Sequence, residues 1–235
     1  MDPRSLIIIV LLFVSSIFDG RFSNPADWLM NILLMLPAVL IGLSFHEFGH
    51  AFTAYKLGDA TPYYQGRVSL NPAAHIDPVG FTCLLLIGFG WGVPVEINPR
   101  NFKNQRRDEL LVSLAGVTMN LLTAVLFAGI LRILVAAAPQ FMYQVDGIGQ
   151  ILMQMLLNVV LVNIVLMVFN LIPVPPLDGF NVVTELFRLR RFAWWYPVYS
   201  NGFFILLVLI LFNVTDWILT PAVMAVYSLL MGIFF

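Results

Sequence analysis

Three ionisable side chains stand close together in an apolar stretch of the chain. The stretch runs from Leu43 to Phe52, reads LSFHEFGHAF, and places His46, Glu47 and His50 within five residues. A spacing of four residues brings two side chains to one face of an α-helix, so His46 and His50 can bind one metal ion through neutral imidazole nitrogens. Glu47, about 100° around the helix from His46, would stand beside the metal. This is the His-Glu-x-x-His pattern, in which the metal polarises a water and the glutamate takes its proton.

The same three side chains could instead form a hydrogen-bonded polar cluster that joins helices without binding a metal. On insertion scales, an acidic or basic residue at the centre of a membrane helix costs about 2.5–3.5 kcal/mol. That cost favours a functional role over a purely structural one. We therefore predict a metal site with His46 and His50 as ligands and Glu47 as the general base.

A catalytic zinc ion usually takes three protein ligands and leaves a fourth position for water. The candidates for the third ligand are one histidine and four carboxylates: His75, Asp59, Asp77, Glu96 and Asp178. Asp178 is the best placed, because it follows an apolar segment with three prolines that should break the preceding helix and leave Asp178 on non-helical backbone. Non-helical chain at membrane depth is tolerated where it is buried in protein or lines a cavity. Asp178 could alternatively cap an amphipathic stretch over residues 180–191.

The elements that must position these residues lie in a membrane. The chain has 235 residues, of which 60% are hydrophobic and only 11% charged, whereas a soluble domain carries about 25% charged residues. Its net charge of −1 argues against a nucleic-acid partner. The single cysteine, Cys83, excludes a disulfide framework and a cysteine-rich metal cluster. The composition predicts an all-α integral membrane protein embedded in a lipid bilayer.

The apolar runs predict about six transmembrane helices. They cover residues 6–17, 28–55, 110–138 and 148–172, and the last run, 202–235, is divided into two short helices by a polar break over residues 213–221. A shorter run over residues 79–91 contains four glycines and is typical of a re-entrant or interfacial element. Residues 61–70 have strand-like character and predict either a β-hairpin at the membrane interface or an edge that pairs with an unwound substrate.

Basic residues predict the orientation, since Lys and Arg accumulate on the cytoplasmic side of membrane proteins. With the N-terminus in the cytoplasm, only Arg21 lies outside, and Arg132 lies near the outer end of the third span. The remaining basic residues fall inside: Arg4, Lys56, Arg67, Arg100, Lys103, Arg106, Arg107, Arg188, Arg190 and Arg191. His46 then lies about 15 Å below the cytoplasmic boundary at 1.5 Å per residue. The site is therefore expected in the cytoplasmic half of the cell membrane.

Several motifs together resemble the site-2 protease family of intramembrane zinc metalloproteases. Besides the histidine pattern, these are N-x-x-P from Asn170, L-D-G from Leu177, and the segments GRVSLNP, HIDP, WGVP, NP and SLAG between residues 66 and 116. The resemblance covers about residues 28–190 and is closest to compact prokaryotic members. It implies one domain over residues 1–235, with a catalytic core at about 28–190 and a C-terminal helical pair at about 202–235.

The resemblance also implies roles for individual residues. His46, His50 and Asp178 would bind one zinc ion and Glu47 would activate water, while Asn120, Asn170 and Gly179 would support the site or the substrate. The substrate would be the transmembrane helix of a membrane protein. The length leaves no room for a PDZ-like or cystathionine-synthase-like domain, so no nucleotide is expected. A membrane metal-ion transporter and a non-catalytic membrane scaffold are the alternatives.

Overall fold

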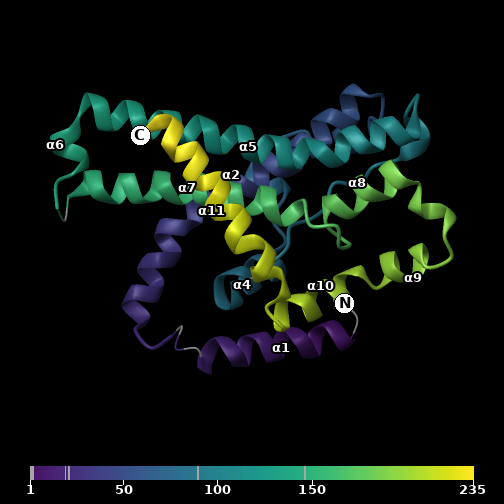
Figure 1. The fold of residues 1–235 in the computed structure, drawn as a ribbon, viewed down its shortest axis with the longest axis horizontal. Helices are drawn as coiled ribbons and strands as arrows, with labels where there is room; N and C mark the ends of the chain where they lie inside the picture. Colours follow the sequence, from purple (N-terminus) through teal and green to yellow (C-terminus); the bar gives the residue numbers. More distant parts are fainter. Residues whose placement is uncertain (1–2, 19, 21, 89, 146) are drawn as a thin grey trace.

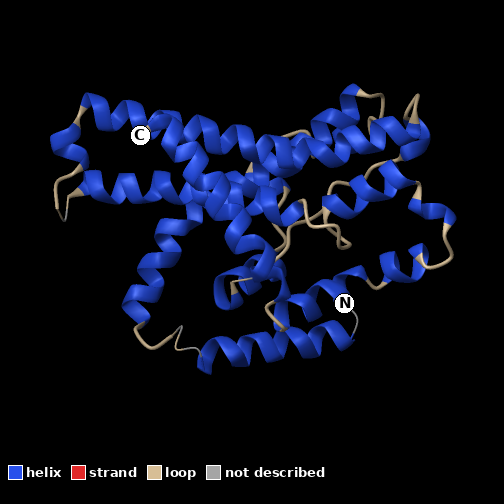
Figure 2. Cartoon of the chain, viewed as in Figure 1, coloured by secondary structure: helices blue, strands red, loops and turns tan. Residues whose placement is uncertain are grey.

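The computed structural model describes every residue except 1–2, 19, 21, 89 and 146, and in the described residues it consists of helices joined by loops, with no strand (Figure 2). Eleven α-helices follow one another in this part of the chain. They are α1 (Pro3–Phe18), α2 (Pro25–Lys56), α3 (Thr61–Tyr64), α4 (Pro78–Ile87), α5 (Gln105–Ala137), α6 (Pro139–Met142), α7 (Ile148–Asn170), α8 (Asp178–Phe187), α9 (Trp195–Ser200), α10 (Gly202–Leu211) and α11 (Val214–Phe234). Three 3₁₀ turns, Pro72–Ala74, Pro99–Asn101 and Leu189–Arg191, lie in the connections.

Four of the described helices, α2, α5, α7 and α11, are long and apolar enough to cross a membrane. Helices α1 and α10 are apolar but have only 16 and 10 residues, fewer than the roughly 20 that a perpendicular span needs. Six spans therefore remain a prediction. The last apolar run is divided at Asn213, which has a φ of 54°, whereas Asp216 and Pro221 lie inside α11.

The long helices begin where the sequence satisfies their free N–H groups. Asn24 accepts a hydrogen bond from the N–H of Ala26 at the start of α2. At the start of α5, Asn104 accepts from the N–H of Arg107, and Asp108 accepts in return from the N–H of Asn104. Such reciprocal caps fix where a helix starts. The caps therefore set the register of the two helices that meet at the candidate site.

Helices α2, α5 and α7 pack together as the centre of the molecule, and α11 packs across α5 and α7 (Figure 1). Ala124 and Ala128 of α5 are fully buried against Val160 and Ile164 of α7. Small residues at such contacts let helix backbones approach closely, which is the usual way helices associate in membranes. The centre is thus a closely packed three-helix unit on which side chains can be held in place.

The connection from α2 to α5 differs from the sequence prediction. The β-hairpin expected over residues 61–70 is absent, because residues 61–64 form the helix α3. Asp59 accepts hydrogen bonds from the N–H and hydroxyl of Thr61, and Pro62 stands in the first turn, both of which favour a helix start. A single antiparallel bridge joins Ile76 to Gly92 in the described part of this connection.

Asp59 also holds the far end of this connection. It is fully buried and accepts hydrogen bonds from the N–H of Asn98 and the side-chain amide of Asn101, at 2.7 Å each. Burial tends to raise the pKa of the Asp59 carboxyl, but the hydrogen bonds from Thr61, Asn101 and Asn98 lower it below its ordinary value. Asp59 is therefore an ionised anchor for the connection.

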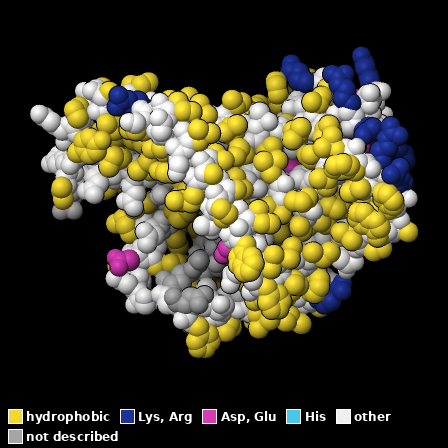
Figure 3. Space-filling view, viewed as in Figure 1, with side chains coloured by type: hydrophobic (Ala, Val, Ile, Leu, Met, Phe, Trp, Pro, Cys, Tyr) yellow, Lys and Arg dark blue, Asp and Glu magenta, His cyan; other side chains and the backbone are white. Residues whose placement is uncertain are grey.

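Lys and Arg side chains gather mainly at one end of the molecule, over α8 and the start of α5, while hydrophobic side chains cover most of the remaining visible surface (Figure 3). This distribution agrees with the charge asymmetry on which the predicted orientation rests. The orientation itself remains a prediction.

Candidate metal centre

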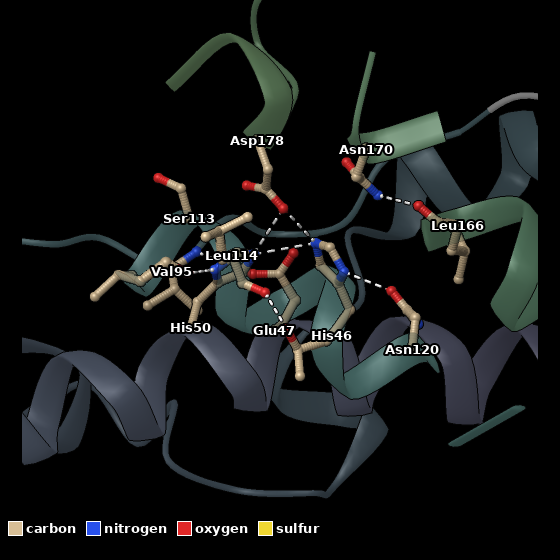
Figure 4. A network of polar contacts seen from close by, with 12 residues as sticks. His46, Glu47, His50, Val95, Ser113, Leu114, Asn120, Leu166, Asn170 and Asp178 are labelled. Atoms are coloured by element: carbon tan, nitrogen blue, oxygen red, sulfur yellow. Dashed lines mark hydrogen bonds and ion pairs between the residues drawn. The ribbon is translucent and has the colours of Figure 1, made fainter. Parts of the chain in front are cut away.

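Two histidines of α2 and one aspartate of α8 meet in the interior of the molecule (Figure 4). The Nε2 atoms of His46 and His50 are 3.1 Å apart, and Oδ2 of Asp178 lies 3.2 Å from each of them. Both histidines are buried. Of the five candidates for the third ligand, the structure brings Asp178 to the histidine pair, and these three form the one potential metal-binding group found among the described residues.

The second nitrogen of each imidazole has a partner on α5. Nδ1 of His50 lies 2.7 Å from the carbonyl oxygen of Val112, which can only accept, so this nitrogen carries the proton. Nδ1 of His46 lies 2.7 Å from Oδ1 of Asn120, whose amide group donates to Gly42 and Asn163 and so leaves Oδ1 as the acceptor. Both Nε2 lone pairs are therefore free to bind a metal.

The arrangement of these three atoms fits a zinc ion. Ligand atoms about 2.0–2.1 Å from a tetrahedral zinc lie about 3.3 Å from one another, close to the 3.1 and 3.2 Å observed here. Two imidazole lone pairs and a carboxylate oxygen would repel each other at these distances without a cation between them. Oδ2 of Asp178 is moreover buried, with no hydrogen-bond partner among the residues that the structure describes. A zinc ion held by His46, His50 and Asp178 would satisfy all three groups.

Asp178 lies on different backbone from that predicted. It is the first residue of α8 rather than part of the non-helical segment. All three prolines lie within residues 171–177, and the helix begins directly after that segment. It does not cap α8, since Leu177 occupies the cap position and no side chain makes a capping bond there. The alternative role as an N-cap is therefore wrong, and the carboxylate is free to point toward the histidines.

Gly179 supports the position of Asp178 by allowing close backbone contact. A Cβ atom at residue 179 would lie only 2.3 Å from the carbonyl oxygen of Leu171. The first turn of α8 thus rests directly on the backbone that follows α7.

Asn170 lies near the site and lines the cavity beside it. Its side-chain amide donates a hydrogen bond to the carbonyl of Leu166 in its own helix.

Glu47 stands beside the three-atom group. Its Oε2 accepts a hydrogen bond of 3.2 Å from the backbone N–H of Val95, in an extended segment that passes the site. Both Glu47 and His46 line a cavity of about 670 Å³ that also borders Trp91 and Leu177. A carboxylate in this position could exchange protons with a water or a substrate in the cavity.

The other four candidate ligands have structural roles away from the histidine pair. Asp59 anchors the α2–α5 connection, and Asp77 caps α4 through the N–H of Gly80. His75 is buried with its Nε2 against the carbonyl of Ser69. Glu96 is exposed, and its Oε2 accepts a hydrogen bond of 2.7 Å from the side-chain amide of Gln65.

Gly116 and Val112 belong to the site, although the sequence pointed to no role for either of them and marked Gly116 only as the end of the SLAG segment. A Cβ atom at Gly116 would lie 2.4 Å from Nε2 of His50 and 2.6 Å from Cε1 of His46, so only glycine lets both rings lie on α5. Its position one helical turn before Asn120 was the available signal. Val112 contributes only its backbone carbonyl, which no side-chain pattern could reveal.

Comparison with known proteins agrees with this geometry. The sequence model described as Peptidase family M50 matches residues 34–211. The chain is 38% identical over 184 residues to "Putative zinc metalloprotease YwhC" of Bacillus subtilis (strain 168), covering 78% of this chain and 82% of the relative. It is 29% identical over 192 residues to "Putative zinc metalloprotease Rip2" of Mycolicibacterium smegmatis, covering 80% of this chain and 70% of the relative. No solved structure matches the chain. The chain therefore belongs to peptidase family M50, the site-2 protease family of zinc metalloproteases that its motifs resemble.

Proposed function

We propose that the protein is an intramembrane zinc endopeptidase that hydrolyses peptide bonds in or near the transmembrane segments of membrane proteins. The observation that carries this proposal is the convergence of His46, His50 and Asp178 with Glu47 beside them at a cavity. A site used only for helix packing would not need an acid facing open space. Regulated intramembrane proteolysis is the biological process that such an activity would serve.

The residues of the chain divide the chemistry between them. When bound, zinc supplies Lewis-acid polarisation of the scissile carbonyl and of the attacking water. Glu47 takes a proton from that water and delivers it to the leaving amine. The backbone N–H of Val95 holds the Glu47 carboxylate at 3.2 Å and thereby fixes its direction. Asn120 and the Val112 carbonyl keep both imidazoles in the tautomer that can bind the metal.

The shape of the interior supports a helical substrate. The cavity at Glu47 shares Leu43 and Trp91 with an apolar cavity of about 300 Å³. That cavity in turn shares Met35 and Val39 with a third cavity of about 540 Å³. The three follow one face of α2 from Asp27 to Glu47, about 30 Å at 1.5 Å per residue, comparable to the hydrocarbon thickness of a bilayer. A transmembrane helix could lie along this face while its unwound end reaches Glu47.

We also propose the membrane arrangement that the charges predict. The N-terminus lies in the cytoplasm, α1 and α10 add two short spans to the four long ones, and the metal site lies in the cytoplasmic half. The basic end of the molecule, over α8 and the start of α5, supports this orientation (Figure 3). A reporter fused after Phe235 is expected to be active only in the cytoplasm.

The experiment measures zinc content and peptide cleavage in the same samples. Wild-type protein, Glu47→Gln, Asp178→Ala and the control Glu96→Gln are purified in detergent without chelators and reconstituted with tagged single-span membrane proteins. Glu96 is a suitable control, since it is an exposed carboxylate on the segment that passes the site. We expect about one zinc per chain in wild type, Glu47→Gln and Glu96→Gln, with cleavage only in wild type and Glu96→Gln.

Other outcomes would contradict the proposal. If wild-type protein contains no zinc, the alternative remains that His46, Glu47 and His50 form a polar cluster that joins helices. Loss of zinc in Glu47→Gln would make Glu47 a ligand instead of the base. Zinc flux into sealed proteoliposomes without any cleavage would indicate a transporter. Against transport, Asn158 and Asn163 of α7 bond to Leu34 and Asn120, so these two amides join helices.

A further inference from the structure

One face of α5 supports the two histidines directly. The carbonyl of Val112 accepts from His50, and the side chain of Asn120 accepts from His46, at 2.7 Å each. Gly116 lies between them and makes room for both rings. Residues spaced three or four apart share one face of a helix. Extended toward the start of α5, the same face reaches residues 109 and 106.

Asp178 lacks support of this direct kind. Its Oδ2 has no hydrogen-bond partner among the described residues, and the two histidines are the groups paired with it. Its position must therefore come from the helix that carries it. That helix, α8, has 10 residues, or about 15 Å of length, so its two ends move together.

The far end of α8 is held by Arg106, in the first turn of α5. Nε of Arg106 donates to the carbonyl of Glu185 at 2.6 Å, and Nη2 donates to the carbonyl of Leu186 at 2.8 Å. These carbonyls are in the last turn of α8, where no further helical N–H can reach them. A cation at this end also complements the negative end of the helix dipole. One guanidinium thus closes α8 and ties it to α5.

A second arginine also connects the end of α8 to the start of α5. Arg190, just beyond α8, pairs with Glu185 of α8 at 2.9 Å and also with Glu109 of α5. Its guanidinium lies 5.6 Å from the centre of the Trp195 ring. The end of α8 is therefore fixed to α5 through both its backbone and a side chain.

We propose that Arg106 is a positioning residue for zinc, which fixes α8 so that the carboxylate of Asp178 meets the two imidazoles. This inference rests on the proposed function. Metal–ligand distances tolerate deviations of only about 0.2 Å, so a small shift of α8 would separate Asp178 from a pair of histidines that α5 continues to hold. The first turn of α5 then acts on the third ligand as Val112 and Asn120 act on the other two.

The test compares Arg106→Ala and Arg106→Gln with the control Arg107→Ala. Arg107 is adjacent and also exposed, and its side chain makes no hydrogen bond or ion pair with another described residue. Zinc affinity is measured in detergent by competition with a chromophoric chelator. The visible absorption of cobalt(II) bound in place of zinc reports the ligand geometry independently of activity.

We expect Arg106→Ala to bind zinc about 10-fold more weakly, at the low end of the loss caused by removing a direct partner of a metal ligand. Arg106→Gln, which keeps one donor, should fall between it and wild type, and both should show an altered cobalt spectrum. Arg107→Ala should match wild type.

Wild-type zinc affinity in a folded Arg106→Ala protein would overturn the inference while leaving the proposed function intact. If Arg106→Ala fails to fold, Arg106→Gln decides alone, and wild-type affinity in that variant overturns it. Equal weakening in Arg107→Ala would also overturn it, because the effect would then follow from lost charge. Wild-type protein that binds no zinc would instead refute the proposed function.

Discussion

Replacing Gly116 with alanine should remove most zinc affinity while leaving the helices intact. The added methyl would lie 2.4 Å from Nε2 of His50, about 1 Å inside ordinary van der Waals contact. In the metal-bound state the His50 ring cannot move away from the methyl, because the metal would hold Nε2 and the Val112 carbonyl holds Nδ1. In the metal-free state the ring can turn aside.

The magnitude follows from where the clash falls. Overpacking a filled interior costs about 1–3 kcal/mol, and here the cost falls mainly on the bound state. At 1.4 kcal/mol per tenfold change, the zinc dissociation constant should rise about 5- to 150-fold. Alanine also has a better helix propensity than glycine by about 1 kcal/mol, so the metal-free variant should not be less stable than metal-free wild type.

The assay is chelator competition on Gly116→Ala and on the control Gly129→Ala. Gly129 lies in the same helix, but a Cβ there would meet only Phe234 at 3.5 Å, an ordinary contact. The control should bind zinc as wild type does. Unchanged zinc affinity in Gly116→Ala would refute the view that the two imidazoles are packed against α5 in the bound state.

Three further changes test other parts of the structure. Asn120→Ala should weaken zinc binding about 10- to 100-fold, because Nδ1 of His46 loses its acceptor, and chelator competition would detect it. Gly179→Ala should lower both the zinc affinity and the thermal unfolding midpoint, because its methyl would lie 2.3 Å from the Leu171 carbonyl; wild-type values for both would contradict the packing. The lowered pKa of Asp59 means that its contribution to stability is complete above its unfolded pKa of about 3.9 and is lost as the pH falls through the lower native value. Acid unfolding of Asp59→Asn, followed by circular dichroism, should therefore show a flatter decline below pH ~4 than wild type, and an identical decline would exclude Asp59 as the anchor.

The sequence predicted the parts of the site that depend on local spacing. His46 and His50 lie on one face because residues four apart in a helix point to the same side. The apolar composition of the surrounding stretch predicted that helix. The proline-rich apolar segment before Asp178 favoured it as the third ligand, and the family resemblance, now confirmed, implied the same residue. Three of the four long helices, α2, α5 and α7, were likewise evident from their apolar length, whereas the run that contains the 21-residue α11 was expected to form two short helices.

The sequence could not predict the parts that depend on tertiary contact. The strand-like pattern near Tyr63 was outweighed by the buried Asp59, whose partners Asn98 and Asn101 lie 39 and 42 positions later in the chain. The start of α8 at Asp178 depends on how its first turn packs on Leu171. The role of Val112 depends on its backbone carbonyl, which every residue has, so no side-chain pattern in the sequence could predict it.

The order of the ligands along the chain has a consequence for biosynthesis. His46 and His50 leave the ribosome early, whereas Asp178 is translated about 130 residues later, after α5, the helix that supports both histidines. At about 5–20 residues per second, the delay is about 6–26 s. During that interval the chain offers the metal only two of its three ligands. On the proposed ligand set, we therefore expect zinc loading to be a late step of membrane insertion, because a chain that ends before α8 lacks Asp178.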